Sequence, residues 1–241
     1  MVERPGREVG AGGGAGASPA DVVRRLPVGE LVWDDLVVPE AVRRRLDELV
    51  ALAVPGGLTV ALSGPAGVGK TFAVRVWAEA MRIDLWRVDC GALVARHGRA
   101  AAGRGLAEVL PLGERPHAIL LFHGSEALLD PAAGDTLAAL IERAAARRAP
   151  TVLESRATTL DPQLPDRVER LALPLPDRAA RRRLWEVLVG RASPLSRPDL
   201  DALAALEVAG ASIDEAVRQV VLERGDERLE TDVLLAAARA A

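Results

Sequence analysis

Short apolar segments alternate with segments of helical periodicity between residues 58 and 173. The run 118–122 is entirely apolar, as expected of a parallel strand that is covered on both faces. Segment 71–81 instead places its apolar residues at helical spacing. Strands that alternate with helices predict an α/β fold around a parallel sheet, with ligands at the carboxyl ends of the strands. The five predicted strands are 58–62, 84–89, 118–122, 150–153 and 171–173.

Composition and helix-start residues predict the other elements of the first 175 residues. Residues 1–17 are rich in Gly and Ala and too poor in large apolar groups to fold, so we expect a disordered tail. An N-cap serine followed by proline predicts a short helix at 18–26, and a later proline opens a longer helix at 39–53. Segment 91–103 is predicted as a loop that leads into a helix, and another helix is expected at 130–148.

The pattern changes at residue 176, after which only helices are predicted. Asp177, Asp199 and Thr231 stand where helix caps are expected, and Ser212 with Glu215 fits a capping box. Four helices in so short a segment predict a small helical bundle that packs on the α/β part, because its core is too small for independent stability.

One loop carries a specific chemical motif. Residues 64–71 fit G-x-x-x-x-G-K-[ST], the phosphate-binding P-loop or Walker A motif, and lie between a predicted strand and a predicted helix as that motif requires. Its glycines allow backbone N–H groups to face a phosphate, and the helix dipole adds positive charge. Lys70 would reach the β- and γ-phosphates of ATP, and the Thr71 hydroxyl would ligate Mg²⁺. The predicted nucleotide-binding residues are Gly64, Pro65, Ala66, Gly67, Val68, Gly69, Lys70 and Thr71.

The lysine of this loop is unusual for this chain. Of the 31 Lys and Arg residues, Lys70 is the one lysine. At a phosphate site, a planar guanidinium is a poor replacement for a compact ammonium on a flexible stem. The retained lysine therefore favours a phosphate-binding loop over a chance glycine-rich turn.

Composition and charge argue against several classes of protein. The net charge of −3, from 31 basic and 34 acidic residues, does not indicate a nucleic-acid surface, and 2% aromatic residues leave few stacking platforms for single strands. The single Cys90 excludes an intramolecular disulfide and a cysteine-rich zinc site. Because no apolar run reaches transmembrane length and no apolar signal segment begins the chain, we expect a cytoplasmic protein without a membrane partner.

A P-loop α/β part followed by a small helical lid resembles the AAA+ ATPases, over roughly residues 30–241. Segment 35–40 looks like the lead-in to AAA modules, 174–177 looks like the entry to their lid, and 210–214 is similar to a lid motif of the AAA subfamily. The resemblance implies ATP and Mg²⁺ as cofactors and assembly into a homo- or hetero-oligomeric ring with a protein partner or client. Together with the composition of the N-terminal segment, it divides the chain into a disordered tail (1–17), a P-loop α/β nucleotide-binding domain with its lead-in (18–175) and a helical lid domain (176–241).

The residues after the third strand depart from the family pattern. In AAA proteins this strand ends in Asp-Glu, where the aspartate orients the Mg²⁺ shell and the glutamate activates water, whereas His123 and Gly124 stand here. Loss of a general base costs about 10²- to 10⁴-fold in rate, and loss of the acidic outer shell weakens metal binding. Glu126 is the nearby candidate for a substitute. The resemblance thus predicts a degenerate Walker B motif.

A further catalytic position of the family is altered, and another has matching residues. After the fourth strand the family places a polar residue, often asparagine, that orients water; here Glu154, Ser155 and Arg156 stand there, with Ser155 as the candidate. Arg167 and Arg170 match the place of an arginine finger offered to a neighbouring subunit. The alternative for both arginines is a solvated turn.

The substrate-handling loop also differs from the family. AAA machines that pull on polypeptides carry an aromatic residue after the second strand, whereas the matching segment 95–98 offers only His97. Such a loop would grip weakly, and a lone histidine is more often a packed or surface residue. His97, His117 and His123 lack metal-ligand spacing with Cys90, so Mg²⁺ is the one metal expected.

Two functions from different classes remain open. The first is an ATP-binding AAA-type module with weak or absent hydrolysis that serves as a regulatory or structural subunit of a protein complex. The alternative is an active AAA ATPase that remodels a protein partner with Glu126 or a neighbour's residue. A P-loop kinase of small molecules fits poorly with the helical C-terminal part.

Overall fold

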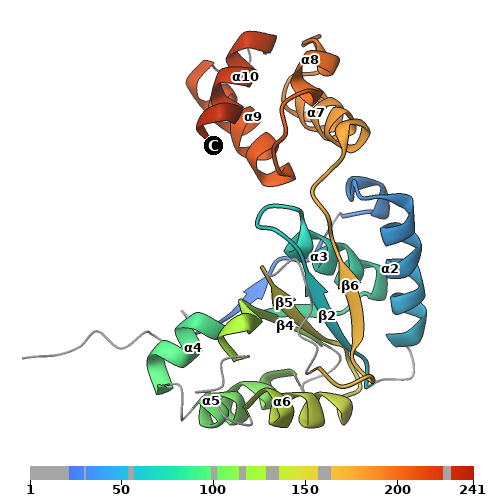
Figure 1. Ribbon diagram of the computed structural model, residues 1–241, viewed down its shortest axis with the longest axis vertical. Coiled ribbons are helices and arrows are strands. Elements are labelled where there is room, and N and C mark those ends of the chain that lie inside the picture. The colour runs from blue at the N-terminus through green and yellow to red at the C-terminus, as the bar shows by residue number, and fades with distance from the viewer. Residues whose placement is uncertain are drawn as a thin grey trace, which may run out of the picture.

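The computed structural model describes residues 22–29, 31–53, 57–98, 102–113, 118–128, 136–156, 164–224 and 229–241. These residues form a sheet with helices on both faces and a group of helices beyond the sheet's end (Figure 1). The predicted α/β fold with a helical C-terminal part is confirmed. The predicted tail lies outside the described residues. No described helix is long and apolar enough to span a bilayer.

The sheet has six strands in the order β1-β3-β4-β5-β2-β6. All neighbours pair in parallel except β1, which is antiparallel to β3 at one edge. β2 lies between β5 and β6, so its carboxyl end, which leads into the P-loop, is enclosed on both sides. The five predicted strands are confirmed, with ends shifted by a residue or two. The strands are β1 (Val23–Leu26), β2 (Thr59–Ser63), β3 (Asp84–Asp89), β4 (Ala118–His123), β5 (Thr151–Ser155) and β6 (Glu169–Ala172).

The prediction of a helix at 18–26 is wrong over Val23–Leu26, which forms the sixth strand. This strand runs along the edge of β3, and an ion pair between Arg25 and Asp84 joins the two. Leu26 buries its side chain against the sheet. The backbone groups at the edge of β3 offer hydrogen bonds, and pairing with them outweighs a weak local helix signal. Residues 18–21 lie outside the described part.

Helices cover both faces of the sheet. α2 and α3 pack on one face, while α4, α5 and α6 pack on the other (Figure 1). Along β4 the side chains alternate: Ile119 and Leu121 face α2 and α3, whereas Leu120 and Phe122 face the other layer. Burial on both faces explains why this strand is apolar throughout. The helices are α2 (Glu40–Ala53), α3 (Lys70–Met81), α4 (Cys90–His97), α5 (Ala102–Val109) and α6 (Thr136–Ala145).

Helix α4 lies in the segment 91–103 that the sequence predicts as a loop, so that prediction is wrong for its first half. Asp89 caps the helix by accepting a hydrogen bond from the Ala92 N–H at 2.9 Å. Cys90 and Leu93 are fully buried. The cap and this burial stabilise a helix that is too short to form from its own propensity, which is why the sequence pattern did not reveal it.

The C-terminal helices have a hydrophobic cluster of their own around Trp185, Ile213 and Leu234. This cluster agrees with the predicted lid domain at 176–241, although the boundary between 18–175 and 176–241 stays a prediction. The helices are α7 (Arg178–Ala192), α8 (Leu200–Ala204), α9 (Gly210–Arg224) and α10 (Thr231–Ala240).

Two of the predicted lid caps are confirmed and two are wrong. Asp177 accepts a hydrogen bond from the Ala180 N–H, and Asp199 caps α8. Ser212 lies inside α9, which begins at Gly210, so it forms no capping box there. Thr231 is the first residue of α10 rather than its cap, and its hydroxyl instead accepts a hydrogen bond from the Asp199 N–H at 2.8 Å. The hydroxyl thus links α10 to the start of α8.

Arg147 is buried where two central strands begin, at the end of the sheet away from the P-loop. Its guanidinium donates to the Ala118 carbonyl oxygen and to Thr151 Oγ1, each at 2.7 Å. We expect Arg147→Ala to lower the free energy of unfolding by about 3 kcal/mol, because it leaves buried acceptors without this donor. For a chain of this size that is a fall of roughly 6–12 °C in melting temperature, measured by circular dichroism.

Arg148→Ala is the matched control for this prediction, since Arg148 is the exposed neighbour of Arg147. Its melting temperature should change by less than about 2 °C, as is usual for an exposed substitution. Equal falls in both variants would mean that the hydrogen bonds of Arg147 do not stabilise the sheet.

Candidate nucleotide-binding site

The P-loop connects the carboxyl end of β2 to the first turn of α3. Gly64, Gly67 and Gly69 have positive φ angles of 147°, 77° and 96°. A Cβ on Gly64 would lie 2.2 Å from the Leu173 carbonyl oxygen, so a larger residue does not fit there. Gly69 takes the left-handed conformation directly before α3. Glycine is thus required by the backbone itself at these positions of the motif.

Lys70 is the first residue of α3 and is buried beneath the loop. Its Nζ donates hydrogen bonds to the carbonyl oxygens of Gly64 and Pro65, each at 2.7 Å. Burial lowers the pKa of the ammonium, while the nearby carboxylates of Glu154 and Glu126 act in the opposite direction. Neutral carbonyls satisfy the N–H groups of the ammonium but not its charge, so the position favours binding of an anion.

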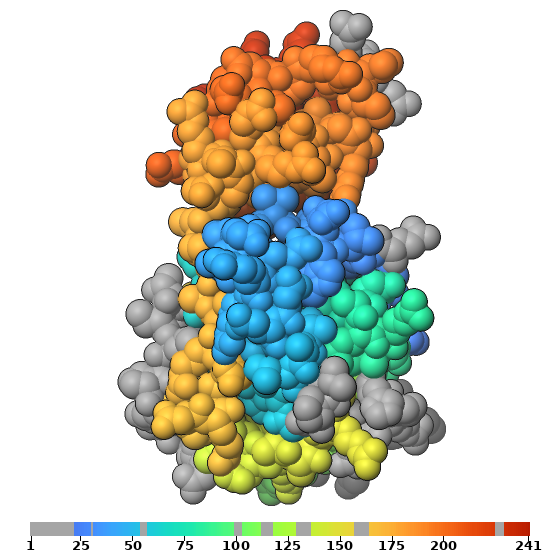
Figure 2. Space-filling view, turned by 90° about the vertical axis from the view of Figure 1, so that its right-hand side faces the viewer, coloured from blue at the N-terminus to red at the C-terminus, as the bar shows by residue number. Residues whose placement is uncertain are grey.

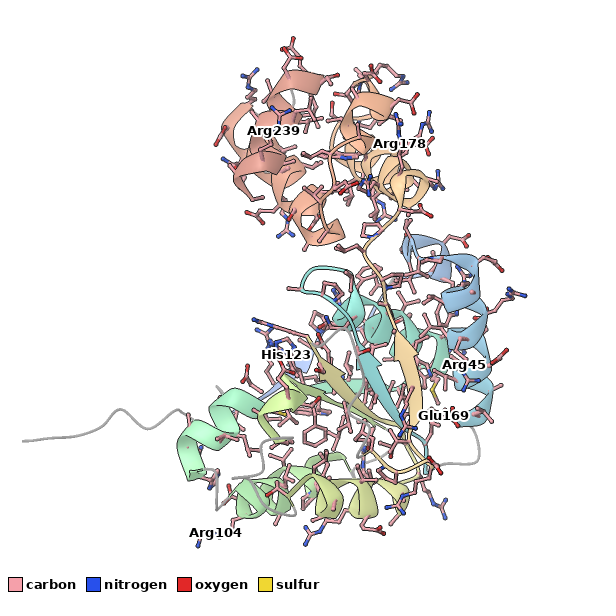
Figure 3. The ribbon with its side chains drawn as sticks, viewed as in Figure 1. Arg45, Arg104, His123, Glu169, Arg178 and Arg239 are labelled. Atoms are coloured by element: carbon pink, nitrogen blue, oxygen red, sulfur yellow. The ribbon has the colours of Figure 1, made fainter. Side chains whose placement is uncertain are left out.

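Thr71, Glu154 and His123 form a polar cluster beside Lys70. Thr71 Oγ1 donates to Glu154 Oε2 at 2.8 Å, and His123 Nδ1 lies 3.2 Å from the same oxygen without forming a hydrogen bond. Glu154 is only 5% exposed. His123 lies at the carboxyl end of β4 (Figure 3), as the register partner of Glu154 on β5. The sequence places Glu154 after the fourth predicted strand but indicates no role for it, because the family pattern expects an uncharged side chain there.

The other two candidates from the sequence lie near this cluster. Glu126 is exposed on the 3-10 turn Ser125–Leu128, where its carboxylate accepts a long hydrogen bond of 3.4 Å from the Arg156 N–H. Ser155 is buried at the end of β5, opposite Ser63 of β2. The catalytic roles of Glu126 and Ser155 stay predictions.

The two arginine-finger candidates lie at the edge of the sheet, around the start of β6. Arg167 is exposed and forms an ion pair with Glu142 of α6. Arg170 donates to the carbonyl oxygens of Leu164 and Val168, and so closes its own loop. Arg167 is therefore the better placed of the two to reach a neighbouring subunit, and its role as a finger stays a prediction.

His97 is the last residue of α4 and packs against α5. A Cβ on Gly105 would lie 2.7 Å from the Cδ2 atom of His97, and His97 Nε2 lies 3.8 Å from a carboxylate oxygen of Glu108. This packing agrees with the alternative that His97 is an ordinary packed residue. Whether segment 95–98 contacts a client stays a prediction.

The lid touches the P-loop through the start of α9. The Ala211 N–H donates to the Gly67 carbonyl oxygen at 2.9 Å, and a Cβ on Gly67 would lie 3.0 Å from that of Ala209. An ion pair between Arg191 of α7 and Asp35, just before α2, joins the lid to the α/β part. Figure 2 shows the lid, in orange, in contact with the N-terminal part of the chain, in blue. The Val32 N–H and the Arg191 guanidinium lower the pKa of Asp35. A molecule bound at the P-loop therefore lies next to the lid.

Comparisons with known proteins agree with this geometry. Residues 60–173 match the family model of the ATPase family associated with various cellular activities (AAA). The chain contains an AAA module. Within the sheet of this module, β5 lies between the P-loop strand β2 and β4. A search of curated proteins finds no match to the chain.

Solved structures extend the likeness beyond the AAA module. The AAA domain of FIGL-1, solved in complex with ADP, has a TM-score of 0.68 at 17% identity, over 92% of this chain and 87% of that chain. The structure of PCH-2 from C. elegans has a TM-score of 0.66 at 16% identity, over 90% of this chain and 74% of that one. At these identities the comparison shows a shared fold, which includes the helical C-terminal part.

The AAA module has groups that fit a nucleotide with Mg²⁺. Positions 64, 67 and 69 of its loop carry no side chain, and the Thr71 hydroxyl beside Lys70 donates a hydrogen bond to the Glu154 carboxylate. Within the described residues, no group of three or more His, Cys, Asp or Glu side chains is arranged to hold a metal ion. That is compatible with Mg²⁺, which is usually held by one or two protein groups together with the phosphates of the substrate.

Proposed function

We propose that the AAA module binds ATP with Mg²⁺ and hydrolyses it slowly or not at all. The protein would then act as a regulatory or structural subunit of a protein complex. The observation that supports this proposal is a complete P-loop beside a strand end without acids. His123 is the last residue of β4 and Gly124 follows it, at the place where AAA proteins carry Asp-Glu.

The proposal assigns a role to each group at the loop. The backbone of 64–69 and the Lys70 ammonium bind phosphates, and the Thr71 hydroxyl ligates Mg²⁺. When bound, Mg²⁺ would neutralise phosphate charge and polarise the phosphoryl oxygens. A base that takes a proton from water is missing at the end of β4, and Glu126, the substitute candidate, is exposed and accepts a hydrogen bond from the Arg156 backbone.

Steady-state phosphate release tests the proposed lack of hydrolysis. We expect wild-type protein with Mg-ATP to release phosphate at or close to the rate of Lys70→Ala, because a missing general base costs about 10²- to 10⁴-fold in rate. Turnover well above that of Lys70→Ala would contradict the proposal and favour an active remodelling ATPase. Glu126→Gln would then show whether Glu126 has replaced the missing base.

Assembly into a homo- or hetero-oligomeric ring, in the cytoplasm and with a protein partner, is part of the same proposal. AAA modules commonly bind nucleotide between subunits, and the exposed Arg167 suits a finger offered across such an interface. Light scattering at high protein concentration with Mg-ATP tests the assembly. Protein that stays monomeric under these conditions would contradict it.

A further inference from the structure

Glu154 is a carboxylate at the carboxyl end of the strand next to the P-loop strand. β5 lies between β4 and β2, and Glu154 is the register partner of His123 on one side and of Leu62 on the other. Neighbouring strands are about 4.8 Å apart. Glu154 is thus one strand nearer to the P-loop than His123, which occupies the position where AAA proteins carry the aspartate of the metal shell.

The Glu154 carboxylate is directed at the hydroxyl that would ligate Mg²⁺. Thr71 Oγ1 donates to Glu154 Oε2 at 2.8 Å, and Glu154 is 5% exposed. A buried carboxylate is costly unless opposite charge or several hydrogen bonds stabilise it. Glu154 therefore needs more than a single hydroxyl to stabilise its charge.

Within the described part of the chain, the contacts of Glu154 meet that requirement only in part, because the nearby Lys70 ammonium supplies opposite charge but few hydrogen bonds reach the carboxylate. There, the bond from Thr71 is the only side-chain hydrogen bond that the carboxylate accepts, and the nearby His123 Nδ1 makes no hydrogen bond. An ionised carboxylate has about four acceptor positions. Most of its capacity is thus free for a cation, or for the water bound to one, next to Thr71.

We propose that Glu154 supplies the acidic group of the Mg²⁺ site from β5, in place of the aspartate that the end of β4 lacks. It would orient the Thr71 hydroxyl and accept hydrogen bonds from the water shell of the metal. This inference rests on the proposed function, because it requires ATP and Mg²⁺ at the P-loop. It also explains how metal-dependent nucleotide binding persists without efficient hydrolysis, since a carboxylate engaged with Thr71 and the metal shell is not free to act as a general base.

The test is the gain in ATP affinity that Mg²⁺ produces. ATP binding is measured by calorimetry once with Mg²⁺ and once with EDTA, for wild type and for Glu154→Gln. Wild type should bind more tightly with Mg²⁺. Glu154→Gln should lose at least about 10-fold of that gain, as is usual when an acidic outer-shell group is removed, and should keep its affinity in EDTA. Glu48→Gln, the same change at an exposed position on α2, is the matched control and should keep the full gain.

The outcomes separate this inference from the proposed function. A Glu154→Gln variant that keeps the whole Mg²⁺-dependent gain would overturn the inference and leave ATP binding at the P-loop intact. An equal loss in Mg²⁺ and in EDTA would also overturn it, because it would mean that Glu154 only shapes the loop. If wild type bound no ATP under either condition, the proposed function would fail, and this inference with it.

A second variant and a second probe keep the inference testable if Glu154→Gln folds poorly. Glu154→Asp keeps the charge but withdraws it by one methylene from Thr71, so a smaller Mg²⁺-dependent gain is expected with the melting temperature preserved. Mn²⁺, a spectroscopic substitute for Mg²⁺, should bind the complex of ATP and wild-type protein more tightly than the complex with either variant, measured by electron paramagnetic resonance. Equal Mn²⁺ affinity in all three proteins would contradict a metal role for Glu154.

Discussion

Lys70→Ala is expected to weaken ATP binding by roughly 100-fold or more. The Lys70 ammonium is buried at the P-loop and donates to the carbonyl oxygens of Gly64 and Pro65. When ATP binds, the ammonium would donate charge-assisted hydrogen bonds to phosphate oxygens, which are about twice as strong as neutral hydrogen bonds. Two such bonds at about 1.5 kcal/mol each contribute about 3 kcal/mol to binding. That is roughly a factor of 100 in Kd, which isothermal titration calorimetry measures.

The stability of the Lys70→Ala protein shows whether the effect is local. Its melting temperature without nucleotide should change little, because two effects oppose each other. The variant leaves the Gly64 and Pro65 carbonyl oxygens without a donor, but it also removes a cation whose burial lowers its pKa. A variant that melts normally but no longer binds ATP places the nucleotide at the P-loop. ATP binding equal to wild type would mean that the nucleotide binds elsewhere or not through this lysine.

Lys70→Arg separates the charge of this residue from its shape. Every other one of the 31 Lys and Arg residues in the chain is an arginine, so the variant asks whether the site needs an ammonium or any cation. A guanidinium is planar and larger than the Nζ group that fits between the two loop carbonyls at 2.7 Å. We expect Lys70→Arg to bind ATP as weakly as Lys70→Ala. Wild-type affinity in Lys70→Arg would mean that charge alone is sufficient.

The central strands and the P-loop were predictable because they depend on local patterns. The apolar run 118–122 indicates a strand buried on both faces, and the order of residues 64–71 identifies the loop whatever surrounds it. Strand β1 and helix α4 were missed because their stability comes from partners: β1 depends on the edge of β3, and α4 on a cap from Asp89 and on burial of Leu93.

The position of Glu154 was not predictable for a similar reason. Its proximity to Thr71 depends on the register of β5 between β4 and β2, which no local pattern encodes. Glu126 was the predicted substitute instead, because it is near the missing acids in the chain, but it is exposed in the structure. The part of the candidate site that lies within the P-loop was thus predictable from the sequence. The part that depends on how neighbouring strands align was not.

Restoring the missing acids is expected to raise ATP turnover by about 10²-fold or more, provided that Glu154 is neutralised at the same time. The variant is His123→Asp, Gly124→Glu and Glu154→Gln together. Without the third change, Asp at position 123 would face Glu154, whose Oε2 now lies 3.2 Å from His123 Nδ1. Two carboxylates at that separation do not both ionise readily. The double variant with only His123→Asp and Gly124→Glu should therefore gain less ATP turnover than the triple variant.

Position 124 sets a second limit on that gain. Gly124 has a φ of +68°, in the left-handed region, where a side chain costs about 1–2 kcal/mol. A Cβ there meets no atom within 4 Å, so the cost is backbone strain and not a clash. The triple variant should therefore melt at a slightly lower temperature than wild type while turning over faster, and phosphate release under saturating Mg-ATP measures the gain.

A matched control shows whether the gain comes from the acids. His123→Asn, Gly124→Gln and Glu154→Gln place side chains of the same size without charge, so this triple variant should show no gain. If the acidic triple variant binds ATP and also shows no gain over an inactive wild type, then the residues at the end of β4 are not what keeps hydrolysis slow. If wild type is already active and the acids add nothing, the chain is a working ATPase, and the carboxylate that serves as its base must come from Glu126 or from a neighbouring subunit.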